Sequence, residues 1–278
     1  MKVFKQVFNF YIDSSIHVAL SAVSLSWITL LDLQIPLDLN LLFFVFFASI
    51  TGYNFVKYFG IAKFHHRSLT NKLKMIQIFS FFCFILMGYF GLQLSLRTLY
   101  YIGGFGLVTF LYAIPFLPKR FFIDQEKNLR SVVGLKIYLI ALVWMGVTVF
   151  LPVIEHQIHV DQSVIIIALQ RFLIVLVLML PFEIRDLRYD SLRLSTVPQQ
   201  IGVKLTKIIG TVLLFVTLFL NYFIKTSSDF TRGVLLVIIL ILFLLLITSN
   251  KEQGKYHSAF WVEGVPVFWL LLRLLEYY

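Results

Sequence analysis

The chain has 278 residues, of which 59% are hydrophobic and 14% are charged, and its formal net charge is +10. Soluble domains carry about 25% charged residues, so this chain lacks the polar residues needed to cover a water-facing surface. The composition excludes a soluble enzyme and a disordered tail, and the single cysteine, Cys83, excludes a disulfide scaffold.

Nine apolar runs follow one another along the chain, each near the ~20 residues that a helix needs to cross a bilayer. They cover residues 14–31, 39–60, 75–94, 98–117, 134–153, 163–182, 205–224, 232–248 and 259–275. Only helices and closed barrels satisfy their backbone within lipid, and these runs show no alternation of period two. We therefore expect an all-α, polytopic integral membrane protein, with nine transmembrane helices forming a single domain over residues 1–278. No good cleavage site follows the first run, so we expect it to be a retained helix rather than a signal peptide.

The lysines and arginines are concentrated in alternate connections. Of the 24 cations, 19 lie in the N-terminal segment or around the connections that follow the second, fourth, sixth and eighth runs, whereas four lie on the other side. Because cytoplasmic loops carry the excess of Lys and Arg, the N-terminus is predicted to be cytoplasmic and the C-terminus outside, in a bacterial cytoplasmic membrane. The cations are spread over separate loops, so the net charge indicates topology and not nucleic-acid binding.

The residues after the sixth run form the strongest candidate site. Glu183, Asp186 and Asp190 are spaced i, i+3 and i+7, which places them on one face of a helix. Carboxylate oxygens suit Mg²⁺, which proteins usually hold with one or two carboxylates plus substrate phosphates. The arginines at 185, 188 and 193 can bind phosphate oxygens. The alternative is a solvated loop in which the acids and arginines pair with each other.

This segment continues into residues 191–202, SLRLSTVPQQIG, and here the sequence resembles the UbiA-type membrane prenyltransferases. The second acidic motif of that family has three acids at this spacing and then Thr-x-Pro-x-x-x-Gly, matched by Thr196, Pro198 and Gly202. A weaker match to the family's Tyr…Lys-Arg loop and the segment after it consists of Tyr112, Pro115, Lys119, Arg120, Asn128 and Gly134.

The resemblance implies a transfer reaction inside the membrane. A prenyl diphosphate would lie with its tail between the helices and its diphosphate at the cytoplasmic mouth, and its prenyl group would pass to an aromatic or lipid acceptor. Glu183, Asp186 and Asp190 would hold Mg²⁺, with Asp186 and Asp190 acting in catalysis. The expected diphosphate-binding residues are Asn54, Lys57, Lys119, Arg120 and Arg185.

The chain departs from the family at the first acidic motif. Asn54 fits this motif, but Tyr58 and Ala62 stand where two acids belong, and no acid occurs between Asp38 and Asp124. Either cations replace the metal there, or the fold survives without transferase chemistry. In the first case the diphosphate would be bound directly by Lys57, Lys63, His65, His66 and Arg67. The simplest interpretation of that stretch is a positively charged cytoplasmic loop.

A few polar residues lie within the apolar runs or at their ends. Arg171 is in the middle of the sixth run, where a charge is expensive, so it should face a partner such as Glu155 or Asp161, or a wet cavity. Glu263 lies within the ninth run and is expected to line the substrate cavity with Tyr112 and Arg171. Asp13 and His17 are one helical turn apart and are expected to pair, to cap the first helix, or to orient an acceptor.

The leading hypothesis is a UbiA-like prenyltransferase, an enzyme whose partners are a prenyl diphosphate, a hydrophobic acceptor and membrane lipids. The alternative is a catalytically inactive homologue that acts as an isoprenoid-lipid binding or scaffold protein. A transporter is the third hypothesis, which the runs disfavour because they include no pair of broken helices. The sequence predicts no particular oligomeric state.

Overall fold

The computed structural model describes residues 2–64, 71–113, 135–188, 196–224 and 228–277. Within these ranges every element is helical. The α-helices are α1 (Lys2–Asp13), α2 (Ile16–Asp32), α3 (Leu39–Phe64), α4 (Asn71–Gly91), α5 (Leu96–Ala113), α6 (Leu135–Met145), α7 (Leu151–Glu155), α8 (Gln162–Asp186), α9 (Val197–Asn221), α10 (Asp229–Thr248) and α11 (Val265–Leu274). Shorter π and 3₁₀ segments are η3 (Gly146–Phe150), η5 (His257–Val262) and η6 (Leu275–Tyr277).

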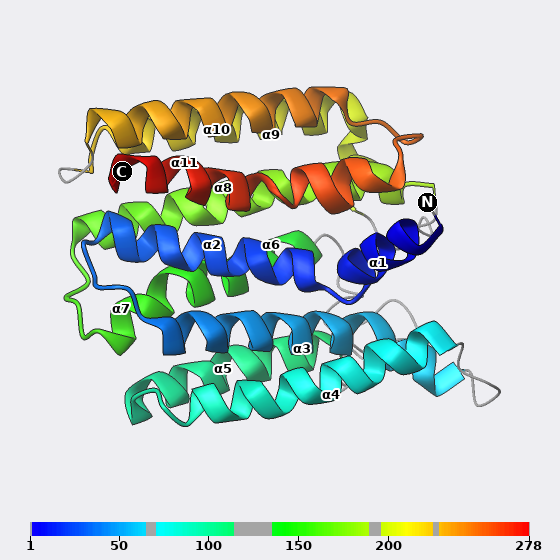
Figure 1. Ribbon diagram of the computed structural model, residues 1–278. Helices are drawn as coiled ribbons and strands as arrows, with labels where there is room; N and C mark the ends of the chain where they lie inside the picture. Colours follow the sequence, from blue (N-terminus) through cyan, green and yellow to red (C-terminus); the bar gives the residue numbers. More distant parts are fainter. Residues whose placement is uncertain (1, 65–70, 114–134, 189–195, 225–227, 278) are drawn as a thin grey trace, which may run out of the picture.

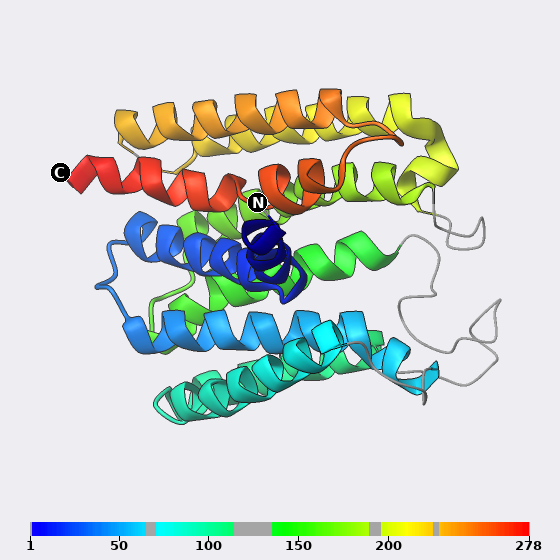
Figure 2. The same ribbon diagram turned by 45° about the vertical axis from the view of Figure 1, so that its right-hand side comes forward.

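The long helices lie side by side in one bundle around α8. Figures 1 and 2 show α9 and α10 along one side of the bundle and α3 with α4 along the other, and α8 between them. In the most apolar 18-residue stretch of α8, 72% of the residues are buried, whereas the corresponding share in the other five long apolar helices is 11–44%. The apolar faces left uncovered on the outer helices are what a lipid environment requires, since lipid takes the place of a protein neighbour.

Six described helices are long and apolar enough to cross a membrane, and the bent pair α1–α2 makes a possible seventh. Within the described residues, each of the nine runs predicted from sequence falls mainly on helical segments, but the number of nine spans is not confirmed. The ninth run is divided into η5, with six residues, and α11, with ten, and neither piece is long enough to span alone. The integral membrane character of the protein is supported by the six long apolar helices.

The bundle has two chemically different ends. The end of α3, the start of α6, the end of α8 and the start of η5 lie at the end of the bundle where α1 begins (Figure 1), which we call the basic end. These segments contain or adjoin Lys57, Lys136, Arg185 and Lys255. The C-terminal residues lie at the other end, which we call the opposite end, together with the junction of α9 and α10. The predicted membrane orientation assigns the basic end to the cytoplasm.

Cysteine labelling tests this orientation. Starting from a Cys83→Ser background, Lys251→Cys places a thiol at an exposed site of the basic end, and Asp229→Cys places one at an exposed site of the opposite end. A membrane-impermeant maleimide added to intact cells should label Asp229→Cys only, and permeabilised cells should show both labelled. The reverse pattern in intact cells would contradict the orientation.

Candidate functional site at the basic end

A bend between α1 and α2 forms the base of the basic end. The two helices meet at 53°, and Ser15 at the junction adopts a left-handed backbone conformation with φ 65°. Asn54 of α3 secures this bend: its amide donates to the Ser14 carbonyl at 3.0 Å and to Ser80 Oγ at 2.8 Å, and its oxygen accepts from Ser15 Oγ at 2.8 Å. Both amide protons of Asn54 are therefore used inside the protein. Its predicted role in diphosphate binding stays a prediction.

Lys57, one turn after Asn54, lies beside the same bend. Its ammonium group donates to Ser15 Oγ at 2.9 Å. Lys57 and Arg185 are also both close enough to Glu263 to act electrostatically on its carboxylate. Three residues predicted separately, from α3, from α8 and from the segment between η5 and α11, are thus brought together. Two cations thus act on one half-buried carboxylate, and one of them, Arg185, also pairs with Asp186.

The acidic segment at the end of α8 is neutralised by neighbouring cations. Glu183 is 2% exposed, and its carboxylate pairs with Lys136 of α6 at 2.8 Å. Asp186 pairs with the adjacent Arg185 at 2.8 Å, and Arg185 also donates to Ser258 Oγ at 3.3 Å. The Asp186–Arg185 pair is of the kind that the solvated-loop alternative describes, whereas Glu183 is buried and pairs with a lysine from another helix.

The described residues do not by themselves form a magnesium site. Among them, no three His, Cys, Asp or Glu side chains are close enough to hold a metal ion together. Asp190, the third predicted ligand, lies outside the described residues, as do Lys119 and Arg120. Tyr112 lies in α5. The magnesium requirement therefore stays a prediction.

Asp13 and His17 do not pair with each other. Asp13 pairs with Lys255 at 3.0 Å, whereas His17 contacts Tyr11 Oη at 2.7 Å and the Phe260 carbonyl at 2.9 Å. Because a carbonyl oxygen can only accept, Nε2 of His17 carries the proton, and Nδ1 of the neutral ring accepts from Tyr11. The expected pairing is wrong because each side chain has a partner from another segment.

Tyr58 occupies the position where the family's first acidic motif has an acid. Its hydroxyl donates to the backbone carbonyl of Asp13 at 2.8 Å and so ties α3 to the end of α1. In this chain that position supports the fold of the basic end.

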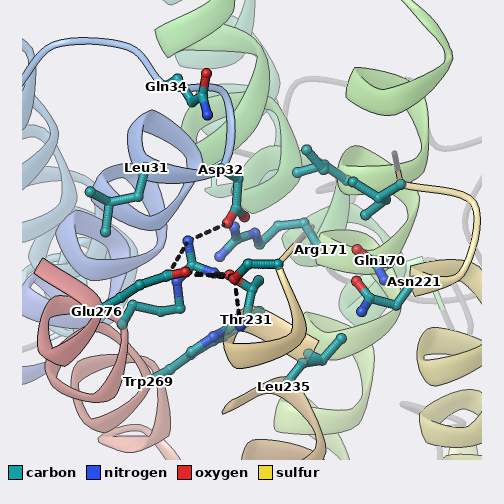
Figure 3. A pocket seen from close by; sticks show the side chains of 14 residues that line it. Leu31, Asp32, Gln34, Gln170, Arg171, Asn221, Thr231, Leu235, Trp269 and Glu276 are labelled. Atoms are coloured by element: carbon teal, nitrogen blue, oxygen red, sulfur yellow. Dashed lines mark hydrogen bonds and ion pairs between the residues drawn. The ribbon is translucent and has the colours of Figure 1, made fainter. Parts of the chain in front are cut away.

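Arg171 lies away from this group of residues, at a cavity of the opposite end (Figure 3). The expected partners of Arg171 are engaged elsewhere. Glu155 accepts from the backbone and hydroxyl of Ser95, and Asp161 caps the start of α8 by accepting from Val164 N. Arg171 instead donates to Thr29 Oγ1 at 3.3 Å.

Several residues of the basic end had no role in the sequence analysis. Lys136, one of the cations of the basic connections, is the ion-pair partner of Glu183. Ser258 accepts from Arg185 and also from Gln253 at 3.1 Å. The adjacent serines at 14 and 15, directly after Asp13, were the available signal for an interrupted first helix, since serine favours caps and turns.

Comparisons with known proteins support the fold. No family model matches the chain, and no curated protein matches it. One solved structure, described as giving structural and mechanistic insights into the biosynthesis of digeranylgeranylglyceryl phosphate synthase in membranes, is similar with a TM-score of 0.57 and 18% sequence identity. The similarity covers 100% of this chain and 98% of that one. At this identity the similarity establishes a shared fold.

Removing the Asn54 side-chain hydrogen bonds should loosen the basic end. We expect Asn54→Leu to lower the free energy of unfolding by about 3 kcal/mol, because the Ser14 carbonyl and two serine hydroxyls lose their partner. Thermal unfolding in detergent measures this loss. Asn40→Leu is the matched control, since Asn40 lies on the same helix and is exposed. Equal stability of the two variants would contradict this role of Asn54.

Proposed function

We propose that this protein binds a prenyl diphosphate at the basic end of the bundle and transfers the prenyl group to an aromatic or lipid acceptor. The observation that carries the proposal is that Lys57 and Arg185, from different helices, both lie within electrostatic range of the Glu263 carboxylate, next to the acidic end of α8. A diphosphate is a compact, multiply charged anion, and this is the kind of ligand that two converging cations recognise.

Both cations keep donors for a ligand. A lysine ammonium has three N–H donors, and among the described residues Lys57 donates only to Ser15. Arg185 has five donors and is engaged with Asp186 and Ser258. Arg185 can present a planar pair of N–H groups to phosphate oxygens, and Lys57 acts as a point charge. Together they would bind the diphosphate and stabilise the charge that develops as it leaves.

The surrounding helices suit the apolar part of such a substrate. The helices that continue from the basic end are apolar, so the space between them would exclude water. A prenyl chain lying there would be protected from hydrolysis at its reactive carbon. The resemblance of residues 181–202 to the second acidic motif of UbiA-type prenyltransferases supports this function. The fold shared with a digeranylgeranylglyceryl phosphate synthase supports it from independent information.

A second candidate function is isoprenoid-lipid binding without transfer. It is favoured by two observations: Tyr58, in place of an acid, bonds to the backbone of Asp13, and the described acids of α8 are paired with cations. Such a protein would bind a polyprenyl lipid saturably and release no diphosphate from any prenyl donor.

Replacing Lys57 by methionine tests the diphosphate site. Lys57→Met keeps the length of the side chain and removes its charge. We expect kcat/KM for a prenyl diphosphate to fall at least tenfold, about 1.4 kcal/mol of lost transition-state stabilisation, mainly through a higher KM. Lys251→Met, an exposed lysine at the same end, should leave the kinetics unchanged. A Lys57→Met protein that is folded and has an unchanged KM would refute this assignment.

Asp186→Asn tests the metal prediction. The substitution keeps the shape of the side chain and removes its charge, so a Mg²⁺-dependent reaction should lose its stimulation by Mg²⁺. Diphosphate release measured over a series of Mg²⁺ concentrations reports this effect, with Glu252→Gln as an exposed control. If Asp186→Asn responds to Mg²⁺ as the wild type does, Asp186 is not a metal ligand.

A further inference from the structure

The opposite end of the bundle contains a cavity that the proposed transferase site does not use. Its volume is about 210 Å³. The residues that line it come from the ends of α2 and α9, the start of α10, the first half of α8, and α11 with η6. Its polar lining includes Asp32, Gln170, Arg171, Asn221 and Arg273 (Figure 3). The basic-end residues that define the transferase proposal do not line it.

One arginine of the cavity is well satisfied by acids. Arg273 is 3% exposed and pairs with Asp32 at 3.1 Å, and Glu276 lies 3.8 Å from the same guanidinium. Glu276 in turn accepts from Ser228 Oγ at 2.5 Å, and Arg273 also contacts Thr231. These groups form a closed network that ties the C-terminal residues to the ends of α2 and α10.

The second arginine is not satisfied in this way. Arg171 is 2% exposed and lies about 13 Å along α8 from its first residue, at 1.5 Å per residue. Its side chain donates to Thr29 at 3.3 Å, and its guanidinium lies over the Trp269 ring at 5.2 Å. Asp32, the partner of Arg273, acts on Arg171 electrostatically but forms no ion pair with it within 4.0 Å, and the Nε and Nη1 atoms of Arg171 have no hydrogen-bond partner among the described residues. Buried, unpartnered N–H donors on a cation are costly, so this arrangement favours a ligand that accepts from them.

The cavity's other lining groups indicate what kind of ligand fits. The carboxamide of Asn221 has no hydrogen-bond partner among the described residues, whereas Gln170 donates to the Thr217 carbonyl at 3.0 Å. Figure 3 shows Arg171 extending from α8 toward Asp32, with Gln170 and Asn221 beside it. An oxyanion can accept from the free guanidinium N–H groups and from the Asn221 amide together.

The charge and the volume of the cavity restrict the class of anion that it can bind. Two arginines and two acids line the cavity, so its formal charge is balanced and a singly charged anion suits it better than a dianion. The volume of about 210 Å³ is many times the ~10–15 Å³ that a single water needs, so the cavity has room for more than a lone carboxylate. A phosphodiester carries one charge and two substituents, and the apolar side chains of Ile224 and Leu235 offer those substituents a surface.

We propose that this cavity binds a phosphodiester, with Arg171 and Asn221 donating to its oxygens. The phosphodiester can come from the head group of a membrane phospholipid or from a soluble compound. The site is separate from the basic end, so the proposal stands whether or not the chain transfers prenyl groups.

Ligand-dependent thermal stability tests this site. Purified full-length protein in detergent is melted with dioleoylphosphatidylglycerol, with dimethyl phosphate, or with dioleoylglycerol, which lacks the phosphodiester. At saturation the phosphodiester should raise Tm by about 5 °C, and dioleoylglycerol should not. A rise with both phosphodiesters identifies the group itself as sufficient, and a rise with the lipid alone identifies a head-group site. No rise with either phosphodiester overturns the proposal.

Variants locate the effect. Arg171→Gln should abolish the rise, and Lys251→Met, an exposed cation at the basic end, should retain it. If Arg171→Gln does not yield folded protein, Asn221→Leu replaces the free carboxamide at nearly constant volume and should weaken the apparent affinity at least threefold. A full rise in a folded Arg171→Gln protein, or unchanged affinity in Asn221→Leu, would overturn the proposed site.

Discussion

The cost of holding a charge among apolar helices determines where the polar residues of this protein lie. A charged side chain at the centre of a membrane helix costs at least about 2.5–3.5 kcal/mol unless a partner compensates it. Glu183, on the most enclosed helix, meets Lys136 from α6. The buried serines at the α1–α2 bend are held by Asn54, whose amide is itself fully used. The ionic contacts accordingly lie toward the two ends of the bundle.

The charged side chains at the two ends of the bundle have different partners, and this difference determines which ligand each end suits. At the basic end, Lys57 and Arg185 lie within electrostatic range of Glu263 and keep N–H donors that an added anion can accept from. At the opposite end, Arg273 pairs with Asp32 and Glu276 and leaves only its Nε unpartnered, whereas Arg171 has two unpartnered nitrogens, Nε and Nη1, and no ion pair among the described residues. The basic end thus suits a multiply charged diphosphate, and the opposite end suits a single charge.

The long helices could be predicted from sequence because apolar length alone defines them. Gly202 of the Thr-x-Pro-x-x-x-Gly segment adopts a backbone conformation that favours glycine. Its φ of 79° interrupts α9, and residues other than glycine rarely adopt that value. Hydropathy did not reveal that the last run is divided by a π-helical segment, because both pieces are apolar. Side-chain partners were harder to predict. Arg171 contacts Thr29 and Trp269, which are far from it in sequence, whereas the acids expected to pair with it are closer to it along the chain.

Diphosphate release from the wild-type protein tests most directly whether the basic end processes a prenyl diphosphate. Purified protein in lipid would receive a panel of prenyl diphosphates, a crude lipid extract as acceptor, and buffer with or without Mg²⁺. We predict release of diphosphate together with a prenylated product whose mass identifies the acceptor. Protein that is folded and binds polyprenyl lipid, yet releases no diphosphate from any donor, would contradict the claim and favour the binding function.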